Sequence, residues 1–437
     1  MIRPHCDTIH ICGSGWPIQR QSFVEESSTL RQGNCRSCGL DGLVPVLDFG
    51  PQPLANRLRR AAELATPEPR VPLCLVMCPF CSLVQITESV PPEVLFEDYP
   101  YFSSVIPSLV AHAKEIADRV VLEQGLGAQS LAMEIASNDG YLLQHYRDAG
   151  VRVLGVDPAR NIAAIAEERG IPTKCAFFGR ELAEELVAEG NRPDVVHANN
   201  VLAHVPDVNG FVAGIATLIG SQGMLITESP YLGDFLEQLE FDTIYHEHLF
   251  YYSITALNSL FNRHGLVIED VEHLAIHGGT LRLTVRSDRV GTSGPAVVAL
   301  LQEERERGID DPNTYARFGD RVRALGDELI ALLDRLTSQG KSIAAYGASA
   351  KGSTLLNTFG IGSERLSFIA DASPHKQGFY APGSGLLIVP PARLLEQHID
   401  YALLLAWNFA EEILDQQRAF RDQGGKFIIP VPSPRIV

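Results

Sequence analysis

The stretch LAMEIASNDGYLL (131–143) decides the fold, because an apolar strand runs into a helix through a loop of small and polar residues. The loop begins at Glu134 and ends at Gly140. Dinucleotide-binding loops carry G-x-G-x-x-G here, whereas Ala136 and Asn138 stand where glycines are expected. Cradling a diphosphate on bare backbone amides is therefore disfavoured. A strand, loop and helix in this order still mark the edge where an open α/β sheet binds its cofactor.

The residues around this loop favour S-adenosylmethionine. The order acid-x-small-x-small-x-Gly suits a cofactor whose amino-acid end approaches the loop without a phosphate. Asp157 closes the next strand, VRVLGVD (151–157), where a carboxylate can accept hydrogen bonds from both ribose hydroxyls. The alternative for Asp157 is a helix N-cap before Pro158. The predicted cofactor site consists of Glu134, Ala136, Asn138, Gly140, Asp157 and Asn199.

Strands and helices alternate on both sides of the loop, which predicts an α/β fold with a doubly wound parallel sheet. LVIEDVEHL (266–274) and GGTLRLTVR (278–286) are predicted as antiparallel strands appended to that sheet. A long amphipathic helix at about 312–339 then leads to a second α/β unit. There KSIAAYGASAKGSTLLN (341–357) is a further strand, loop and helix.

The eight cysteines all lie at or before Cys175, so they do not staple the whole chain. Two pairs, Cys35-x-x-Cys38 and Cys78-x-x-Cys81, have the spacing with which both sulfurs of a knuckle reach one zinc ion. Four thiolate ligands leave no open position, so we expect a structural rather than a catalytic metal. Cys74 is a near neighbour that could compete as a ligand.

A cluster of ionisable residues follows the strand that ends near ESPY (228–231). The run Tyr245-His246-Glu247-His248 is embedded among apolar residues, which disfavours a merely solvated loop. His-x-His lacks the spacing of a helical zinc motif, so we predict a histidine general base with an adjacent carboxylate that orients it. Tyr231 lies at the end of this strand, where active sites of such sheets gather, and is a candidate substrate-binding residue. His277 and His204 are further candidates for the site, and a structural role explains each of them equally well.

Lys351 lies in the loop YGASAKGST (346–354), which follows a strand and begins a helix. Backbone amides at a helix N-terminus together with a lysine form an anion site, although a plain tight turn explains the loop nearly as well. The loop is not a Walker motif, and it lacks the glycine spacing that a dehydrogenase needs.

Composition limits the function classes. A chain of 437 residues suggests about three domains. A net charge of −17 disfavours nucleic acids and anionic membranes as partners. No apolar stretch is long enough for a membrane span, and the N-terminus has no signal-peptide pattern, so we expect a cytoplasmic protein. The predicted division is an extension (1–34), a zinc-binding domain (35–95), an α/β domain with the cofactor loop (96–310) and a C-terminal domain (311–437).

The chain resembles the three-domain C-methyltransferases that act on nucleotide-linked keto sugars. The resemblance runs from about Cys35 to the C-terminus. It rests on CRSCG, MCPFCSLVQ, EIASNDGYLL with GVDPARN, NVLAHVPD, ESPYL, FDTIYHEHLFYYS, HGGTLR, YGASAKG, DASPHKQG, AWNFAEEI and FIIPVPSP. The extension before Cys35 and the cysteine at position 74 depart from the family pattern.

The resemblance implies a zinc-bearing N-terminal domain, a class I methyltransferase domain and a Rossmann-like C-terminal domain that helps to hold the nucleotide sugar. It implies His248 as the base that removes the proton next to the keto group, with Tyr245 and Glu247 supporting it. Tyr231, His246, His277 and Lys351 are then the expected substrate-binding residues. We expect methylation at C3 of a dTDP-4-keto-6-deoxy sugar in deoxysugar, antibiotic or surface-glycan biosynthesis.

Two other classes of function stay open at this point. One is an O- or N-methyltransferase on a related sugar or small molecule. The other is a zinc-stabilised binding protein without catalysis, against which Glu134, Asp157 and the complete Tyr245–His248 run argue. Self-contained domains allow a monomer or a weak homodimer.

Overall fold

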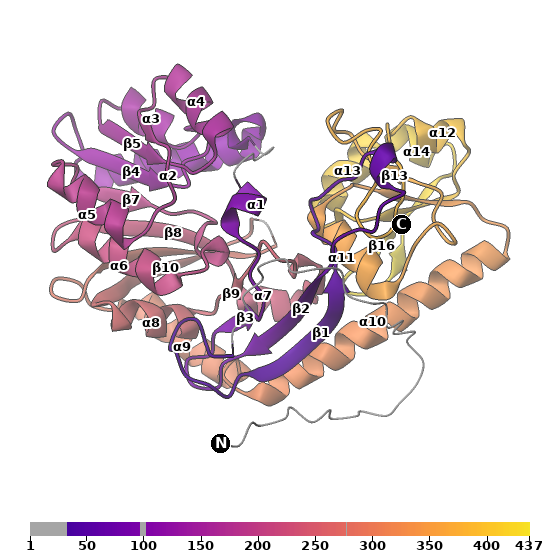
Figure 1. Ribbon diagram of the computed structural model, residues 1–437, viewed down its shortest axis with the longest axis horizontal. Helices are drawn as coiled ribbons and strands as arrows, with labels where there is room; N and C mark the ends of the chain where they lie inside the picture. The colour runs from indigo at the N-terminus through magenta and orange to yellow at the C-terminus, as the bar shows by residue number, and fades with distance from the viewer. Residues whose placement is uncertain (1–32, 97–101, 277) are drawn as a thin grey trace.

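The computed structural model describes residues 33–96, 102–276 and 278–437. The predicted extension, Cys6, Cys12 and His277 therefore lie wholly or largely outside the described residues. Three sheets account for the strands (Figure 1). In the described ranges, no helix combines the length and the apolar character needed to cross a membrane.

The first sheet belongs to the cysteine-bearing part of the chain. Its strand order is β1-β2-β3-β9, and every pair is antiparallel. The fourth strand comes from far along the sequence, because β9 directly follows the run Tyr245–His248. The elements are β1 (Val44–Gln52), the 3-10 helix η1 (Ala61–Glu63), β2 (Val71–Met77), β3 (Val84–Ile86) and β9 (Phe250–Tyr251).

The central sheet has seven strands in the order β10-β11-β8-β7-β4-β5-β6. Five strands are parallel, β11 runs antiparallel to β8, and β10 pairs antiparallel with β11, as the sequence predicts. The strands are β4 (Leu131–Ile135), β5 (Arg152–Val156), β6 (Thr173–Lys174), β7 (Val195–His197), β8 (Met224–Pro230), β10 (Leu266–Leu274) and β11 (Thr280–Ser287).

Helices cover both faces of this sheet, which makes it doubly wound. A small apolar core forms between one face and α2 and α3, while the other face contributes to the main core. The helices are α1 (Pro92–Phe96), η2 (Ser103–Val105), α2 (Pro107–Gln124), α3 (Leu143–Asp148), α4 (Arg160–Glu168), α5 (Arg180–Ala188), η3 (Leu202–His204), α6 (Val208–Ile219), α7 (Leu232–Gln238), η4 (Phe241–Thr243), α8 (Ile254–Arg263) and α9 (Pro295–Arg307).

The third sheet has the order β14-β13-β12-β15-β16-β17, with β17 antiparallel at one edge. Its parallel strands read 3-2-1-4-5 in chain order, as in a Rossmann half. The elements are β12 (Ile343–Tyr346), α11 (Ala350–Phe359), β13 (Ile369–Ala370), β14 (Ile388–Val389), α12 (Arg393–Glu396), β15 (Tyr401–Leu404), η5 (Trp407–Phe409), α13 (Ala410–Gln416), α14 (Arg418–Asp422), β16 (Lys426–Ile429) and β17 (Arg435–Ile436).

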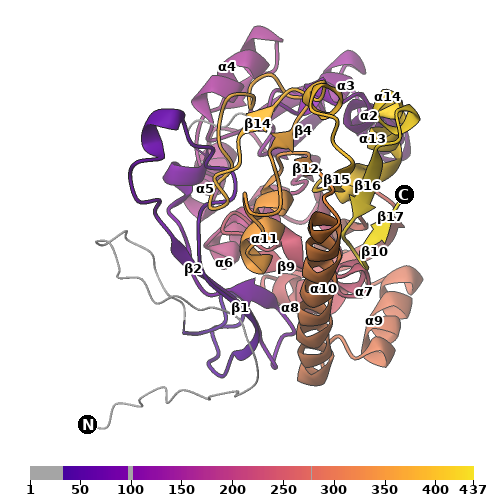
Figure 2. The ribbon, with the colours of Figure 1, turned by 90° about the vertical axis from the view of Figure 1, so that its right-hand side faces the viewer.

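The long helix α10 (Pro312–Ser338) joins the units (Figures 1 and 2). Asp311 caps it by accepting a hydrogen bond from the amide of Asn313, and Pro312 occupies its first turn. Gly319 lets the helix approach β1 closely, because a Cβ there would lie 3.2 Å from the Val46 carbonyl oxygen. The main apolar core is continuous from the cysteine knuckles to the last sheet, so the three units pack as one body.

Candidate functional site

Four cysteine sulfurs form a cluster at the N-terminal sheet. The Sγ atoms of Cys35, Cys38, Cys78 and Cys81 all lie within 4.8 Å of one another. Two of the separations are 3.5 Å, between Cys35 and Cys81, and 3.6 Å, between Cys38 and Cys78. A tetrahedral zinc ion with Zn–S bonds of about 2.3 Å separates its sulfurs by about 3.8 Å. The cluster therefore fits a closed, structural zinc site.

The two knuckles have the same backbone design. Gly39 and Ser82, each directly after the second cysteine of its pair, donate their amides to the carbonyls of Cys35 and Cys78. Both residues have positive φ angles, +78° and +59°. Cys74 does not belong to the four-sulfur cluster and instead lies on β2 opposite Asp48, so the structure does not support it as a competing ligand.

The cofactor loop follows β4, and its backbone has the positive φ angles of a glycine-rich loop at positions that are not glycine. Ala136 and Asn138 adopt φ angles of +58° and +49°, and Gly140 follows at +79°. The amides of Ala136 and Ser137 donate to the Val156 carbonyl. Ala136 and Asn138 thus adopt the left-handed conformation although they are not glycines. Hydrogen bonds to β5 help to offset the steric cost.

Gly155 on β5 makes room for this loop. A Cβ there would lie 2.5 Å from Oγ of Ser137 and 2.9 Å from Oγ1 of Thr173. The loop can therefore cross the end of β5 only because position 155 has no side chain. This requirement is a packing constraint that the loop sequence alone does not reveal.

Three carboxyl groups lie close together around the loop. Glu134 is buried, and its pKa is raised well above the usual range by burial and by the charges of Asp157 and Asp139. Its Oε2 is buried and has no hydrogen-bond partner among the described residues. Arg169 pairs with Asp139 at 2.9 Å. The acidic surroundings favour a cofactor that carries positive charge, as the sulfonium and amino groups of S-adenosylmethionine do.

Asp157 both closes the second strand and organises the loop. One carboxylate oxygen accepts a hydrogen bond from the amide of Asn138, and the other accepts from the amide of Ala159, each at 2.9 Å. The N-cap of α4 is Ala159, so Asp157 is not the capping residue, although its carboxylate accepts a hydrogen bond from the amide of Ala159. Asn199 follows β7, and its Oδ1 is a second buried oxygen without a partner in the part of the chain that the structure describes.

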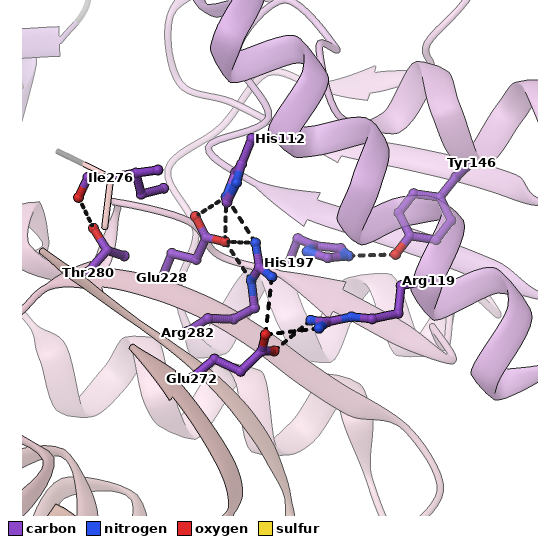
Figure 3. A network of polar contacts seen from close by, with 9 residues as sticks. All are labelled: His112, Arg119, Tyr146, His197, Glu228, Glu272, Ile276, Thr280 and Arg282. Atoms are coloured by element: carbon purple, nitrogen blue, oxygen red, sulfur yellow. Dashed lines mark hydrogen bonds and ion pairs between the residues drawn. The ribbon is translucent and has the colours of Figure 1, made fainter. Parts of the chain in front are cut away.

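A network of polar side chains connects α2 with the strands β8, β10 and β11 of the central sheet (Figure 3). Arg282 lies opposite both Glu228 and Glu272 in the strand register. Its guanidinium contacts Glu228 at 2.7 Å, and Arg119 of α2 forms two hydrogen bonds with Glu272. His112 of α2 lies 2.9 Å from Glu228, whose pKa stays low because His112 and Arg282 outweigh burial. Glu228 therefore ties α2 to the sheet.

The run Tyr245–His248 belongs to a segment that we call the histidine segment (241–252). It lies where the three units meet. Its strand β9 pairs with β3 of the cysteine-bearing sheet, and Ile244 accepts a hydrogen bond from Oγ1 of Thr354 on α11. A small cavity of about 10 Å³ beside Tyr245 is lined by residues of the N-terminal unit and of α11.

His248 is held as a neutral imidazole. Its Nδ1 lies 2.9 Å from the Thr243 carbonyl, which can only accept, so Nδ1 carries the proton. Nε2 then has a free lone pair, to which the Tyr245 hydroxyl donates at 3.0 Å. Burial lowers the pKa of His248 to about 3, and the neighbouring His204 and Lys351 act in the same direction. The imidazole is thus unprotonated, but so low a pKa makes it a weak base until a negative charge lies beside it.

The structure corrects the predicted role of Glu247 as the group that orients the imidazole. The Glu247 carboxylate accepts two hydrogen bonds from Nδ2 of Asn56, at 2.8 and 2.9 Å, while Thr243 orients His248. Burial raises the pKa of Glu247 to about 7, and the Asn56 hydrogen bond opposes this shift. Thr243 takes the place predicted for Glu247 because consecutive residues of an irregular segment point in different directions.

Among the described residues, the side chains of His246 and Tyr231 form no hydrogen bond with His248. Nε2 of His246 lies 3.2 Å from the carbonyls of Val71 and Pro72, which binds the segment to β2. Tyr231 is 2% exposed, and its ring packs against His273. Neither side chain contacts His248 in these interactions, and the predicted role of both residues in substrate binding stays a prediction.

Lys351 lies beside the histidine segment. Its Nζ is 3.8 Å from Oδ1 of Asp242 and 4.0 Å from the centroid of the Trp407 ring. Nε1 of Trp407 donates to the other Asp242 oxygen at 2.6 Å. The lysine thus brings a positive charge near the imidazole, from a different unit of the chain. His204, an open candidate, also joins the cluster, with its ring 5.0 Å from that of His248.

Sequence reasoning missed Asn56, Thr243, Asp242 and Trp407. Asn56 lies 191 residues before its partner Glu247, and Thr243 contributes only a backbone carbonyl, so neither contact leaves a signal in the spacing. Two signals could have drawn attention to the others. Asp242 lies near the run Tyr245–His248 in the chain, and Trp407 lies near the end of a strand.

Comparisons with known proteins agree with this geometry. Three family models match successive parts of the chain: a zinc binding domain (35–96), a methyltransferase domain (111–271) and a C-methyltransferase C-terminal domain (275–432). The C-methyltransferase NovU of Streptomyces niveus is 38% identical over 404 residues, which cover 92% of this chain and 96% of the relative.

More distant relatives match only the central part. A ubiquinone biosynthesis O-methyltransferase of Methylobacterium sp. (strain 4-46) is 32% identical over 126 residues, 27% of this chain and 49% of the relative. Among solved structures, magnesium protoporphyrin IX methyltransferase (ChlM) from Synechocystis PCC 6803 aligns with a TM-score of 0.32 and 16% identity, over 41% of this chain and 79% of that chain.

The full-length relative, the three family models and the sulfur cluster together define the protein. The fold is a class I methyltransferase sheet with a zinc-binding unit before it and a Rossmann-like unit after it. Its cofactors are S-adenosylmethionine and structural zinc. The chain belongs to the S-adenosylmethionine-dependent C-methyltransferases of the family that includes NovU.

Proposed function

We propose that this C-methyltransferase acts on a nucleotide-linked 4-keto-6-deoxy sugar, removes the proton next to the ketone with His248 and methylates the resulting enolate, at C3 of a dTDP-linked sugar. The observation that carries the proposal is the neutral imidazole, whose Nε2 lone pair is fixed by the Thr243 carbonyl on the opposite ring nitrogen. Carbon methylation requires a carbanion equivalent, and a ketone is what makes a neighbouring C–H acidic enough for an imidazole.

The proton and electrons balance within this step. The C–H electron pair moves into the enolate, and the proton goes to Nε2 of His248, once the hydrogen bond from the Tyr245 hydroxyl to this nitrogen has opened. The enolate carbon then forms the new C–C bond in line with the S–CH₃ bond that breaks. The bound cofactor supplies the electrophilic methyl group. The Tyr245 hydroxyl lies on the side of the ring to which the Nε2 lone pair points. Lys351 provides positive charge for the anionic substrate and the enolate oxygen.

The C-terminal unit is our candidate holder of the nucleotide. Its first loop precedes α11, with Ser349 capping the helix by accepting from the amide of Gly352. Asp371, at the end of β13, accepts a hydrogen bond from the amide of Ala348 at 2.7 Å. We place the domain boundaries at 35–95, 96–310 and 311–437, and the substrate between the histidine segment and this loop. His277, outside the described residues, keeps its proposed role in substrate binding.

The test is incubation with methyl-labelled S-adenosylmethionine and a panel of nucleotide sugars with and without a 4-keto group. We expect labelled product only from keto sugars, with the methyl group located on the ring carbon next to the ketone by NMR. In D₂O without methyl donor, the same substrates should exchange that carbon-bound hydrogen. Methylation of oxygen or nitrogen, without exchange, would contradict the proposal.

A further inference from the structure

The zinc-binding unit sends a long arm (53–70) away from its sheet. The arm lies between β1 and β2 and accounts for the long spacing between the two cysteine pairs. It is anchored on the C-terminal unit, because Arg59 and Tyr380 exchange backbone hydrogen bonds of 2.9 and 2.8 Å. The amide of Gly383 also donates to Glu68 at 2.8 Å. Figure 1 shows this indigo segment reaching from the N-terminal sheet to the C-terminal unit.

Asn56 is the residue of the arm that reaches the histidine segment. Its Nδ2 lies 2.8 and 2.9 Å from the two carboxylate oxygens of Glu247. Glu247 is 7% exposed, whereas Asn56 is exposed on the surface of the arm. A buried carboxylate needs hydrogen-bond donors, and among the described residues Asn56 is the side chain that donates to it.

We propose that Asn56 is a positioning residue for methyl transfer: its amide fixes the carboxylate of Glu247, the residue before His248 in the chain, so that the zinc-binding unit completes the site of the base. The inference rests on the proposed role of His248. The Glu247 side chain forms no described hydrogen bond with His248, so its effect on the base passes through the shared backbone and through the charge of the carboxylate. A carboxylate released from Asn56 would either reorient or become neutral, and both changes alter the field at the imidazole.

Other ionisable groups lie along the same segment or contact its backbone. His246 and His248 flank it in the chain, His204 on η3 donates to its backbone carbonyl at 2.7 Å, and Lys351 on α11 acts on the adjacent imidazole. Burial raises the pKa of Glu247 to about 7, and Asn56 is the hydrogen bond that lowers it. Removing the amide leaves burial unopposed, so the carboxyl group should take up a proton at higher pH.

The experiment titrates Glu247 directly and needs no sugar substrate. Full-length protein with ¹³C-carboxyl-labelled glutamate is followed by NMR, and Glu247→Gln assigns the signal by its disappearance. In Asn56→Ala we expect the Glu247 pKa to rise by about one unit, as loss of one hydrogen bond to a charged group implies. The control is Arg57→Ala, the exposed neighbour on the same arm. Asn56→Ser is the second variant should the alanine variant not fold.

Methyl transfer to the substrate from the keto-sugar panel gives the second readout. At pH 7 we expect Asn56→Ala to lower kcat about tenfold, with the affinity for the methyl donor unchanged and kcat recovering at higher pH. In the Glu247→Gln variant, adding Asn56→Ala should lower kcat no further. An unshifted Glu247 pKa, or a full additional loss in that variant, would overturn the inference. Failure of the keto-sugar assignment would leave the titration result intact, so the two proposals fail separately.

Discussion

The hydroxyl of Tyr245 lies 3.0 Å from Nε2 of His248, and the Thr243 carbonyl lies 2.9 Å from Nδ1 on the other side of the ring. One imidazole is therefore held between an acceptor that fixes its tautomer and a donor that marks its basic nitrogen. All three groups belong to one short segment, whose position depends on contacts with the zinc-binding and C-terminal units.

Replacing His248 by Gln should remove the base while preserving side-chain volume and hydrogen bonding. Loss of a general base costs about 10²- to 10⁴-fold in rate, so kcat for methyl transfer should fall by that range. Tyr245→Phe removes only the hydrogen bond to Nε2 and should cost about tenfold. The measurement is transfer of labelled methyl at saturating substrates. Undiminished transfer by His248→Gln would exclude His248 as the base.

The His248 imidazole should stay neutral from pH 5 to pH 8. Burial lowers its pKa to about 3, and a depressed histidine pKa means that the unprotonated form dominates at every pH above that value. The ¹⁵N chemical shifts of its ring nitrogens, assigned with His248→Gln, should show the Nδ1–H tautomer throughout. A midpoint near the ordinary histidine pKa of about 6.5 would contradict this prediction.

Removing zinc should abolish methyl transfer, because the zinc-binding unit contains the sheet that holds the histidine segment in place. Structural zinc sites contribute about 10–16 kcal/mol to folding, and β9 of the segment pairs with β3 of this unit. Cys78→Ser should lose zinc and activity, while the affinity for S-adenosylmethionine changes little, because the cofactor loop follows β4. Cys74→Ser, outside the sulfur cluster, is the matched control and should keep its zinc. Retained activity in zinc-free protein would refute the coupling.

Asp157→Asn should weaken cofactor binding about 10- to 150-fold. The carboxylate accepts from the amides of Asn138 and Ala159, and hydrogen bonds to a charged group contribute about 1.5–3 kcal/mol. The asparagine NH₂ group would face one of these donors and disturb the loop. Calorimetric titration with S-adenosylmethionine measures the effect. Asp148→Asn, exposed at the end of α3, should bind normally, and equal affinities of both variants would disprove a role of Asp157.

Lys351→Met should raise KM for the nucleotide sugar about tenfold and leave cofactor affinity unchanged. The change removes a positive charge beside Asp242 and Trp407, where we place the anionic substrate. Lys341→Met removes a lysine of the same unit that pairs with Asp400 and serves as the control. Steady-state kinetics separates the two effects. An unchanged KM would place the nucleotide elsewhere.

The sequence by itself determined the local features. The knuckle spacing specified which four cysteines cluster, since two residues between cysteines suffice to bring their sulfurs together. Alternating apolar strands and helices specified the central sheet, including the strands after Gly265. The loop from Glu134 to Gly140 was recognisable although its left-handed residues are Ala136 and Asn138. In each case the interacting residues are close in the chain or repeat with a fixed period.

Only the tertiary structure decided which side chains meet around His248. Glu247 binds Asn56 from 191 residues away, His246 binds β2, and Lys351 approaches from the last unit. Adjacent residues of an irregular segment have no periodicity, so their directions follow from packing against distant strands rather than from their order. The strand β9 shows the same dependence, because its partner β3 comes from a unit that the sequence separates from it by the whole cofactor-binding core.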